Sequence, residues 1–119
     1  MINTKTAKTM LANIKYSMGR NKVSNRPVKE VSITETDIID LYHKQNGKCY
    51  WTGLLLDGHF NTVKHHPFAI SADRLDNSKG YTKDNVVLVR RMFNLGRMSF
   101  PEKDFADAMR ILKEEFNAN

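Results

Sequence analysis

The segment from Phe68 to Arg97, FAISADRLDNSKGYTKDNVVLVRRMFNLGR, places the strongest constraint on the fold of this chain. It contains two short apolar runs, residues 68–75 and 86–89, and a stretch of helical character after the second run. The loop between the runs contains Asn77-Ser78-Lys79-Gly80, which is typical of a turn because Gly adopts positive φ freely and Asn and Ser bind nearby backbone groups. The segment therefore predicts the order strand, loop, strand, helix.

Two residues of this segment carry side-chain oxygens at positions where they could meet. Asp73 lies at the end of the first predicted strand, and Asn94 lies inside the predicted helix. Folding the hairpin onto the helix could bring both oxygens to one point, and hard oxygen ligands favour Mg²⁺ or Mn²⁺ over zinc. Taken alone, Asp73 is better explained as a strand-end carboxylate that pairs with Arg74 or Lys79 at the surface.

The pattern ADRLDNSKGYTKDNVVLV followed by Asn94 resembles the HNH endonuclease family, in particular its small phage-type members. The resemblance covers roughly residues 34–98. It implies an α+β fold, a ββα-metal (HNH) core with flanking N-terminal and C-terminal helices, in which Asp73 and Asn94 bind one divalent metal ion and Asn85 opens the second strand. It also implies a DNA endonuclease that hydrolyses phosphodiester bonds with Mg²⁺, or with Mn²⁺ in its place.

Position 74 departs from the family pattern, because Arg74 stands where the family has its general-base His. A guanidinium stays protonated and cannot accept a proton from water, but it can bind a phosphate with two hydrogen bonds. The candidates for activating water are Asp76, then His65 or His66, and finally a metal-bound water without a protein base. Asn85 is expected to hold the loop in shape by hydrogen bonds, so Arg74, Asp76 and Asn85 are the predicted catalytic residues.

The absence of the family's His leaves a second function open. The chain could be a catalytically inactive HNH-fold protein that binds nucleic acid. A third interpretation is a small basic protein that binds another protein and carries the motif by coincidence. Metal-dependent cleavage separates the first two functions, and salt-sensitive DNA binding separates both from the third.

Charge is distributed unevenly along the chain. Nineteen Lys and Arg against thirteen Asp and Glu give a net charge of +6, and the excess lies in residues 1–33, which contain seven basic residues and one acid. Basic side chains that contact phosphates release counterions, so this segment indicates a nucleic-acid partner, although a basic face can also simply keep a protein soluble. The predicted nucleic-acid contacts are Lys15, Arg20, Lys22, Arg26, Arg90, Arg91 and Arg97.

At 119 residues the chain is expected to form a single domain. Residues 1–33 are expected to form a basic N-terminal helix and arm, residues 34–98 the HNH-like core, and residues 99–119 a C-terminal packing helix. The N-terminal helix is predicted over Thr6 to Met18 with Gly19 as its stop, and a second helix is predicted over 35–45 after a capping residue at Thr34. The C-terminal helix is expected to close the core with an apolar face formed by Phe105, Met109, Leu112 and Phe116.

The sequence also excludes several classes of protein. No apolar run approaches the length of about 20 residues that spans a membrane, and the polar start is not a secretory signal. Cys49 is the one cysteine, so an intramolecular disulfide or a four-thiolate zinc site is excluded. We therefore expect a cytoplasmic protein. If the family resemblance holds, it is phage-encoded and acts in the host cell. The oligomeric state is open between a monomer and a homodimer.

Trp51 and residues 54–56 are expected to form an apolar platform behind the ββα unit.

Overall fold

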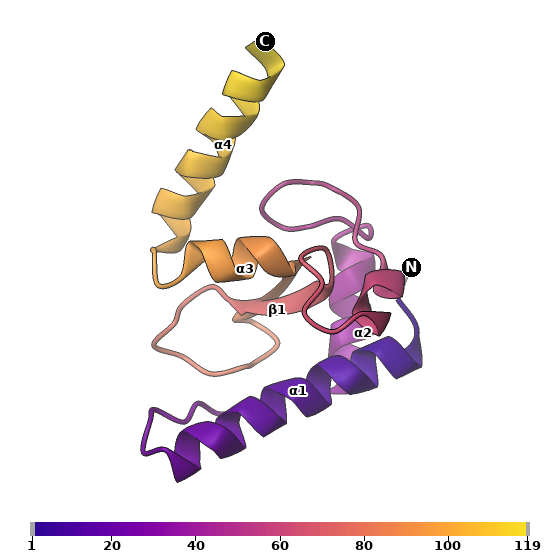
Figure 1. The fold of residues 1–119 in the computed structure, drawn as a ribbon, viewed down its shortest axis with the longest axis vertical. Helices are drawn as coiled ribbons and strands as arrows, with labels where there is room; N and C mark the ends of the chain where they lie inside the picture. The colour runs from indigo at the N-terminus through magenta and orange to yellow at the C-terminus, as the bar shows by residue number, and fades with distance from the viewer. Residues whose placement is uncertain (1, 119) are drawn as a thin grey trace.

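Two antiparallel strands and the helix that follows them lie at the centre of the fold in the computed structural model, which describes residues 2–118 (Figure 1). The strands β1 (Ile70–Arg74) and β2 (Val86–Arg90) pair with Ile70 opposite Arg90 and Arg74 opposite Val86. The remaining elements are α1 (Thr4–Val23), α2 (Glu35–Lys44), the 3₁₀ helix η1 (Gly58–Thr62), α3 (Arg91–Arg97) and α4 (Glu102–Ala118). The predicted order of strand, loop, strand and helix is confirmed.

The hydrophobic core surrounds β2. Val86 to Val89 are all buried, and Ile38 and Leu41 of α2 belong to the same apolar cluster. Trp51 and Leu56 are also buried there, whereas Leu54 and Leu55 are exposed, so the predicted platform is confirmed only in part. No helix within residues 2–118 has the length and apolar character to cross a membrane.

Helix α2 begins as the sequence predicts. The Thr34 hydroxyl accepts a hydrogen bond from the backbone of Asp37 at 3.1 Å, and the Asp37 carboxylate accepts one from the backbone of Thr34 at 3.0 Å. This reciprocal pair satisfies two backbone donors that a helix start leaves free. The helix ends at Lys44, and Asn46 and Gly47 follow with positive φ.

Helix α1 is longer than predicted, because it continues through Gly19 to Val23. Glycine inside a helix costs only about 1 kcal/mol relative to alanine, so Gly19 does not stop α1. The helix ends where the Ser24 backbone bonds the Arg20 carbonyl and Asn25 adopts a positive φ. Arg20 and Lys22 therefore lie in the last turn of a helix, not in a loop.

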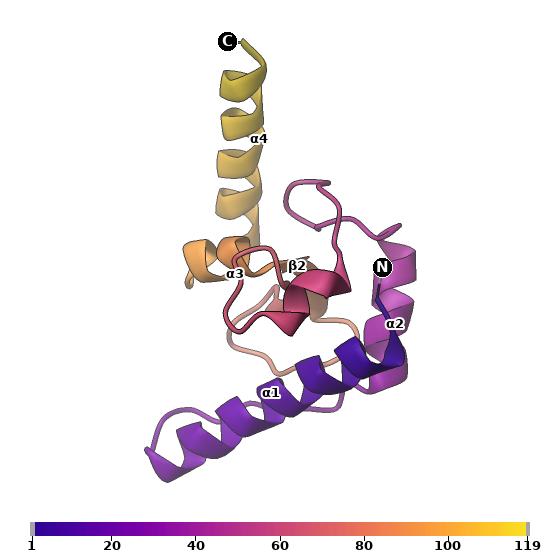
Figure 2. The same ribbon diagram turned by 45° about the vertical axis from the view of Figure 1, so that its right-hand side comes forward.

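Helix α4 projects away from the rest of the molecule in both views (Figures 1 and 2). Phe105 is buried against the Trp51 ring, with 4.9 Å between ring centroids, but Leu112 is 40% exposed and Phe116 is 72% exposed. The prediction that this whole helix closes the core is wrong beyond its first turns. An apolar stripe shows that a helix has two faces, but it does not show how far a partner extends along it.

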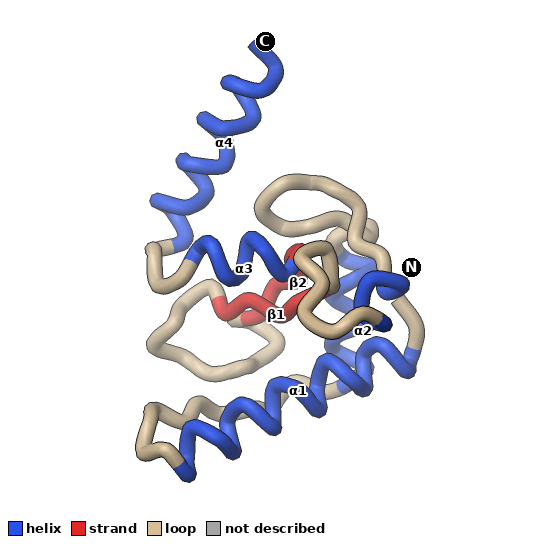
Figure 3. The backbone as a smooth tube through the Cα atoms, in the orientation of Figure 1, coloured by secondary structure: helices blue, strands red, loops and turns tan. Residues whose placement is uncertain are grey.

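The connection between α1 and α2 is joined to the hairpin loop, which Figure 3 shows in tan between the strands and α1. Tyr81 donates its backbone N–H to the Glu30 carbonyl at 2.7 Å, and the Tyr81 carbonyl accepts from Ser32 and Ile33. Gly80 lies so close that a Cβ added there would be 2.6 Å from the Glu30 carbonyl oxygen.

The two glycines predict opposite effects of an added methyl group. We expect Gly80→Ala to lower the free energy of unfolding by about 1–3 kcal/mol, because it forces the loop away from the connecting segment. We expect Gly19→Ala, where a Cβ meets no atom within 4 Å, to raise it by about 0.5–1 kcal/mol. Urea unfolding followed by circular dichroism measures both, and equal effects would contradict the close contact at Gly80.

Candidate functional site

Asp73 lies on β1 and is almost completely enclosed, at 2% exposure. Its Oδ1 accepts a hydrogen bond from Nη1 of Arg97 at 2.6 Å, and its Oδ2 accepts one from the indole Nε1 of Trp51 at 2.7 Å. Burial raises the pKa of the Asp73 carboxyl above its ordinary value, and the Trp51 and Arg97 donors act in the opposite direction. Both carboxylate oxygens therefore have donors from within the protein.

Arg97, in the last turn of α3, is 1% exposed and forms the other half of this ion pair. Its guanidinium also donates to three backbone carbonyls, those of Arg74, Leu75 and Phe100. The prediction that Arg97 contacts a nucleic-acid backbone is wrong, because its guanidinium is enclosed and its four hydrogen bonds hold β1, α3 and the approach to α4 together.

Asn94 lies one helical turn before Arg97 but contacts a different part of β1. Its Nδ2 donates to the Ser71 hydroxyl at 2.8 Å and to the Ala72 carbonyl at 3.2 Å. Because the Ala72 carbonyl can only accept, the amide nitrogen must face the strand and Oδ1 must face away from it. The Asn94 amide nitrogen is therefore used to hold α3 against β1.

These residues do not fit a divalent metal ion as they are arranged. Asp73 is enclosed, both its oxygens accept hydrogen bonds, and the guanidinium of Arg97 already supplies a positive charge beside the carboxylate. Among the described residues 2–118, no three His, Cys, Asp or Glu side chains gather as a metal site. We therefore assign no metal-dependent step to Asp73 and Asn94, the predicted ligand pair.

Arg74 and Asn85 hold the hairpin loop. Nη1 of Arg74 donates to the carbonyls of Asn77 and Lys79, and its guanidinium carbon lies 5.0 Å from the centroid of the Tyr81 ring. The Asn85 side chain crosses the same loop, donating to the carbonyls of Asp76 and Gly80 and accepting from the backbone of Asp76. The expected loop-holding role of Asn85 is confirmed, and Arg74 shares it.

Asp76 is exposed and begins a local turn. Its Oδ1 accepts from both the backbone and the hydroxyl of Ser78, at 2.9 and 2.6 Å. These hydrogen bonds lower the pKa of the Asp76 carboxyl below its ordinary value. Such a carboxylate is ionised at neutral pH but is a weak base.

The two histidines beside β1 use their Nδ1 atoms for hydrogen bonds within the protein. Arg91 approaches Nδ1 of His65 at 3.3 Å, and the backbone of Phe68 donates to Nδ1 of His66 at 3.0 Å. Because both partners are donors, each neutral ring carries its proton on Nε2 and presents no free basic nitrogen. Activation of water by either ring first requires one of these contacts to break.

The remaining predicted nucleic-acid residues fall into two groups. Lys15, Arg20, Lys22 and Arg26 are exposed, and α1 contains five basic residues and no acid. Arg90 and Arg91 are only half-exposed, since Arg90 donates to the Leu55 carbonyl and lies 4.3 Å from the Phe68 ring, and Arg91 contacts His65. The exposed basic surface is thus concentrated on α1 and the turn after it.

Sequence reasoning missed a regular feature of this surface. Lys8, Lys15 and Lys22 are all exposed and recur every seven residues, about 10 Å apart along the helix axis. Residues at that spacing share one side of a helix, so these lysines form a ridge. Their spacing is visible in the sequence once the helix is known to continue past Gly19.

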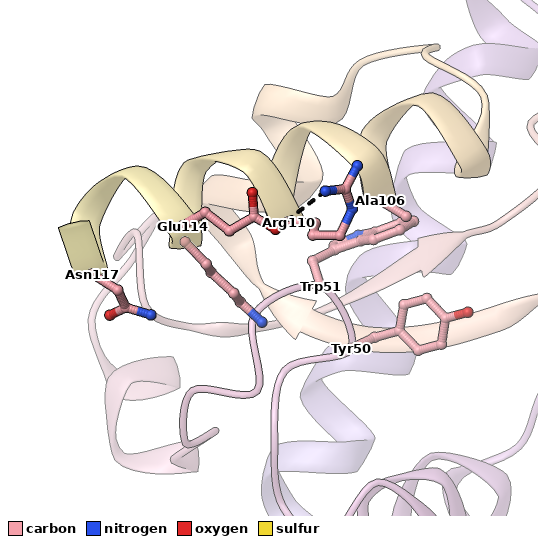
Figure 4. A pocket seen from close by; sticks show the side chains of 7 residues that line it. Tyr50, Trp51, Ala106, Arg110, Glu114 and Asn117 are labelled. Carbon is pink, nitrogen blue, oxygen red and sulfur yellow. Dashed lines mark hydrogen bonds and ion pairs between the residues drawn. The ribbon is translucent and has the colours of Figure 1, made fainter.

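A hollow of about 420 Å³ lies between α4 and the Tyr50–Trp51 segment (Figure 4). Arg110 and Glu114, which border it, pair with each other along the helix at 3.2 Å, as the dashed line in Figure 4 shows. Tyr50, at its other side, donates its hydroxyl to Glu102 at 2.8 Å. Arg110 and Glu114 thus partly neutralise each other at the edge of the hollow, and Lys113 is its remaining charged lining residue.

The antiparallel hairpin with α3 packed against β1 and helices on either side forms an α+β fold of the HNH type. Among solved structures, that of the rare-cutting HNH restriction endonuclease PacI, a protein described as perturbing DNA, aligns with this chain at a TM-score of 0.69. The alignment covers 94% of this chain and 80% of the PacI chain at 14% sequence identity, and at that identity it shows the fold alone. No protein-family model and no curated protein matches the sequence.

The buried ion pair predicts a large difference between two arginines. We expect Arg97→Met to lower the free energy of unfolding by about 3–5 kcal/mol, because it leaves the enclosed Asp73 charge without its partner. We expect Arg110→Met to change it by less than about 1 kcal/mol, because the Arg110–Glu114 pair is exposed. Thermal and urea unfolding measure both variants, with Arg97→Lys as a form that keeps the charge and loses the planar fork.

A small effect of Arg97→Met would show that Asp73 does not depend on this pair. Asp73 would then be available to a cation, and the structural interpretation of the carboxylate would fail.

Proposed function

We propose that this protein is a DNA endonuclease of the HNH type, which hydrolyses phosphodiester bonds. The observation that supports this most is the alignment of almost the whole chain with an HNH restriction endonuclease. Fold likeness alone is an argument by analogy. The proposal is also supported by an independent feature, the exposed basic surface of α1, which suits a polyanionic substrate.

In this proposal, α1 and the turn after it bind the DNA backbone through Lys15, Lys22 and Arg26. Their charges release counterions and add affinity that does not depend on sequence. Arg90 and Arg91 lie at the junction of β2 and α3. They could bind a phosphate near the hairpin if that phosphate replaced their present contacts within the protein. Arg74 and Asn85 act indirectly, by keeping the loop that borders this surface in one shape.

A requirement for Mg²⁺, with Mn²⁺ as an alternative, stays a prediction of the family resemblance. Bound metal would supply charge stabilisation at the phosphate. The enclosed Asp73 carboxylate does not fit that role in its present arrangement, so no step is assigned to it.

A second function is favoured by a specific observation. Asp73, a predicted metal ligand, is paired with Arg97, and His65, His66 and Asp76 are all engaged in hydrogen bonds. An HNH scaffold with this arrangement could bind DNA without cutting it. The two functions share the DNA-binding surface and differ only in cleavage.

Cleavage of supercoiled plasmid is the test that separates them. With Mg²⁺ or Mn²⁺ we expect nicking that a chelator abolishes. We expect Asn94→Ala to reduce it by about 100-fold, because the variant loses the hydrogen bonds that hold α3 against β1 and a slightly misplaced site can lose about that much rate. Asn117→Ala, on the far end of α4, is the matched control and should cut like the unmodified protein. Salt-sensitive DNA binding without nicking under either metal would favour the binding protein instead.

The proposed binding surface predicts a salt dependence for duplex DNA. The logarithm of the association constant should fall linearly with the logarithm of salt concentration, with a slope of about −0.9 for each phosphate neutralised. Lys15→Gln, Lys22→Gln and Arg26→Gln should each make the slope shallower by about that amount. Lys103→Gln and Lys113→Gln on α4 should leave it unchanged. Fluorescence anisotropy at several salt concentrations measures the slope, and equal effects on both helices would rule out α1 as the specific contact.

A further inference from the structure

A second hollow lies at the C-terminal end of α1. It has a volume of about 470 Å³ and is lined by Tyr16, Gly19, Arg20, Val23, Ser24 and Arg26. The lining combines one aromatic ring with two guanidinium groups and contains no acid. This combination differs from that of a purely apolar groove and favours a ligand that is both flat and negatively charged.

The turn after α1 is held in place by hydrogen bonds. The Asn21 carbonyl accepts from the backbone of Arg26 at 2.8 Å, and the Asn21 side chain donates to the Pro27 carbonyl at 3.1 Å. Asn25 adopts a φ of 56°, a conformation that asparagine tolerates and that reverses the chain. These contacts bring Arg26 back beside the helix, so one wall of the hollow is formed by a fixed turn.

Tyr16 presents an aromatic surface to solvent, since its side chain is 70% exposed. Arg20 follows one turn later, with its guanidinium carbon 5.4 Å from the ring centroid. This cation–π contact restricts the ring and places a positive charge beside it. The ring therefore adds little to the folded core, and what distinguishes it from other exposed rings is its place beside two guanidinium groups at the hollow.

Gly19 explains why the hollow stays open. It lies on the same side of α1 as Tyr16 and Val23, three residues after the first and four before the second. A Cβ added at Gly19 would meet no atom within 4 Å, so a longer side chain at this position would extend into free space beside the ring. The glycine therefore keeps the Tyr16 surface accessible.

We propose that this hollow binds one unpaired nucleotide of a DNA strand, with its base stacked on Tyr16 and its phosphate bound by Arg20 and Arg26. The inference rests on the proposed function, because it assumes a DNA substrate, and it narrows that substrate to duplex DNA that carries unpaired nucleotides. Every base has a π-face that can stack on an aromatic ring, and guanidinium groups bind phosphate with charged hydrogen bonds. A base inside an intact duplex cannot reach the ring, so fully paired DNA binds through the phosphate contacts of α1 and the turn after it and gains nothing from Tyr16.

The test compares a blunt duplex with the same duplex carrying a short single-stranded extension, by fluorescence anisotropy at one fixed salt concentration. The unmodified protein should bind the extended duplex about tenfold more tightly. Tyr16→Ala should remove that preference and leave blunt-duplex affinity unchanged, whereas Tyr16→Phe should keep it. Gly19→Leu, which fills the hollow and leaves the ring in place, should also remove it. Phe116→Ala, which removes a ring of similar exposure on α4, is the control and should have no effect.

A fluorescent adenine analogue at the first unpaired position reports stacking directly, since its emission should be quenched by the unmodified protein and not by Tyr16→Ala. Equal binding of the two duplexes, or a preference that survives Tyr16→Ala, would overturn the inference while leaving DNA binding by α1 intact. Absence of salt-sensitive binding to either duplex would overturn the proposed function as well.

Discussion

The hydrogen-bonded ion pair between Asp73 and Arg97 is the interaction on which the rest of the structure depends. Moving a carboxylate and a guanidinium out of water costs several kcal/mol for each ion, and mutual attraction offsets this only if their other hydrogen-bonding groups also have partners. Here Trp51 donates to the carboxylate, and three backbone carbonyls accept from the guanidinium. No buried side-chain nitrogen or oxygen in residues 2–118 is left without a partner. The pair therefore fixes the angle between β1 and α3 and connects both to Trp51, which in turn supports the first turns of α4.

Within this HNH-type fold, the ion pair gives the carboxylate of the first strand a structural role. A carboxylate at the end of the first strand is suited to a metal ion only if it is accessible and carries uncompensated negative charge. In this chain the carboxylate is compensated by an arginine three residues after Asn94. The same position in a fold can thus hold a ligand in one sequence and a structural counter-ion in another, so function must be argued from the site. For the same reason, loss of activity after a change at Asp73 would report on folding before it reported on catalysis.

Local patterns predicted the parts of the structure that depend on neighbours in sequence. The Thr34–Asp37 capping box, the turn at Asn77 to Gly80 and the loop-holding Asn85 all involve partners within ten residues of each other. Asp73 and Arg97 are separated by 24 positions, and nothing in either local pattern indicates that one neutralises the other. Gly19 was predicted to end a helix, but its cost there is only about 1 kcal/mol, and the helix ends instead where Asn25 adopts a positive φ. The exposure of the second half of α4 was not predicted for a related reason. Its apolar stripe shows which face of the helix is apolar but does not show whether another element covers that face.

The contacts between the connecting segment and the hairpin loop give the proposed DNA-binding surface a fixed relation to the ββα unit. Lys29 donates to the Ser78 carbonyl at 3.3 Å, Val31 pairs with Tyr81, and Gly80 permits the close approach of Glu30. The loop is itself held from within by Arg74 and Asn85, which leaves little freedom between β1 and the segment that leads back to α1. Basic side chains on an unattached tail could raise affinity, but they could not select a position on the DNA. Because α1 is packed on α2 and its following segment is bonded to the loop, a strand bound along α1 would meet the hairpin at one distance and orientation.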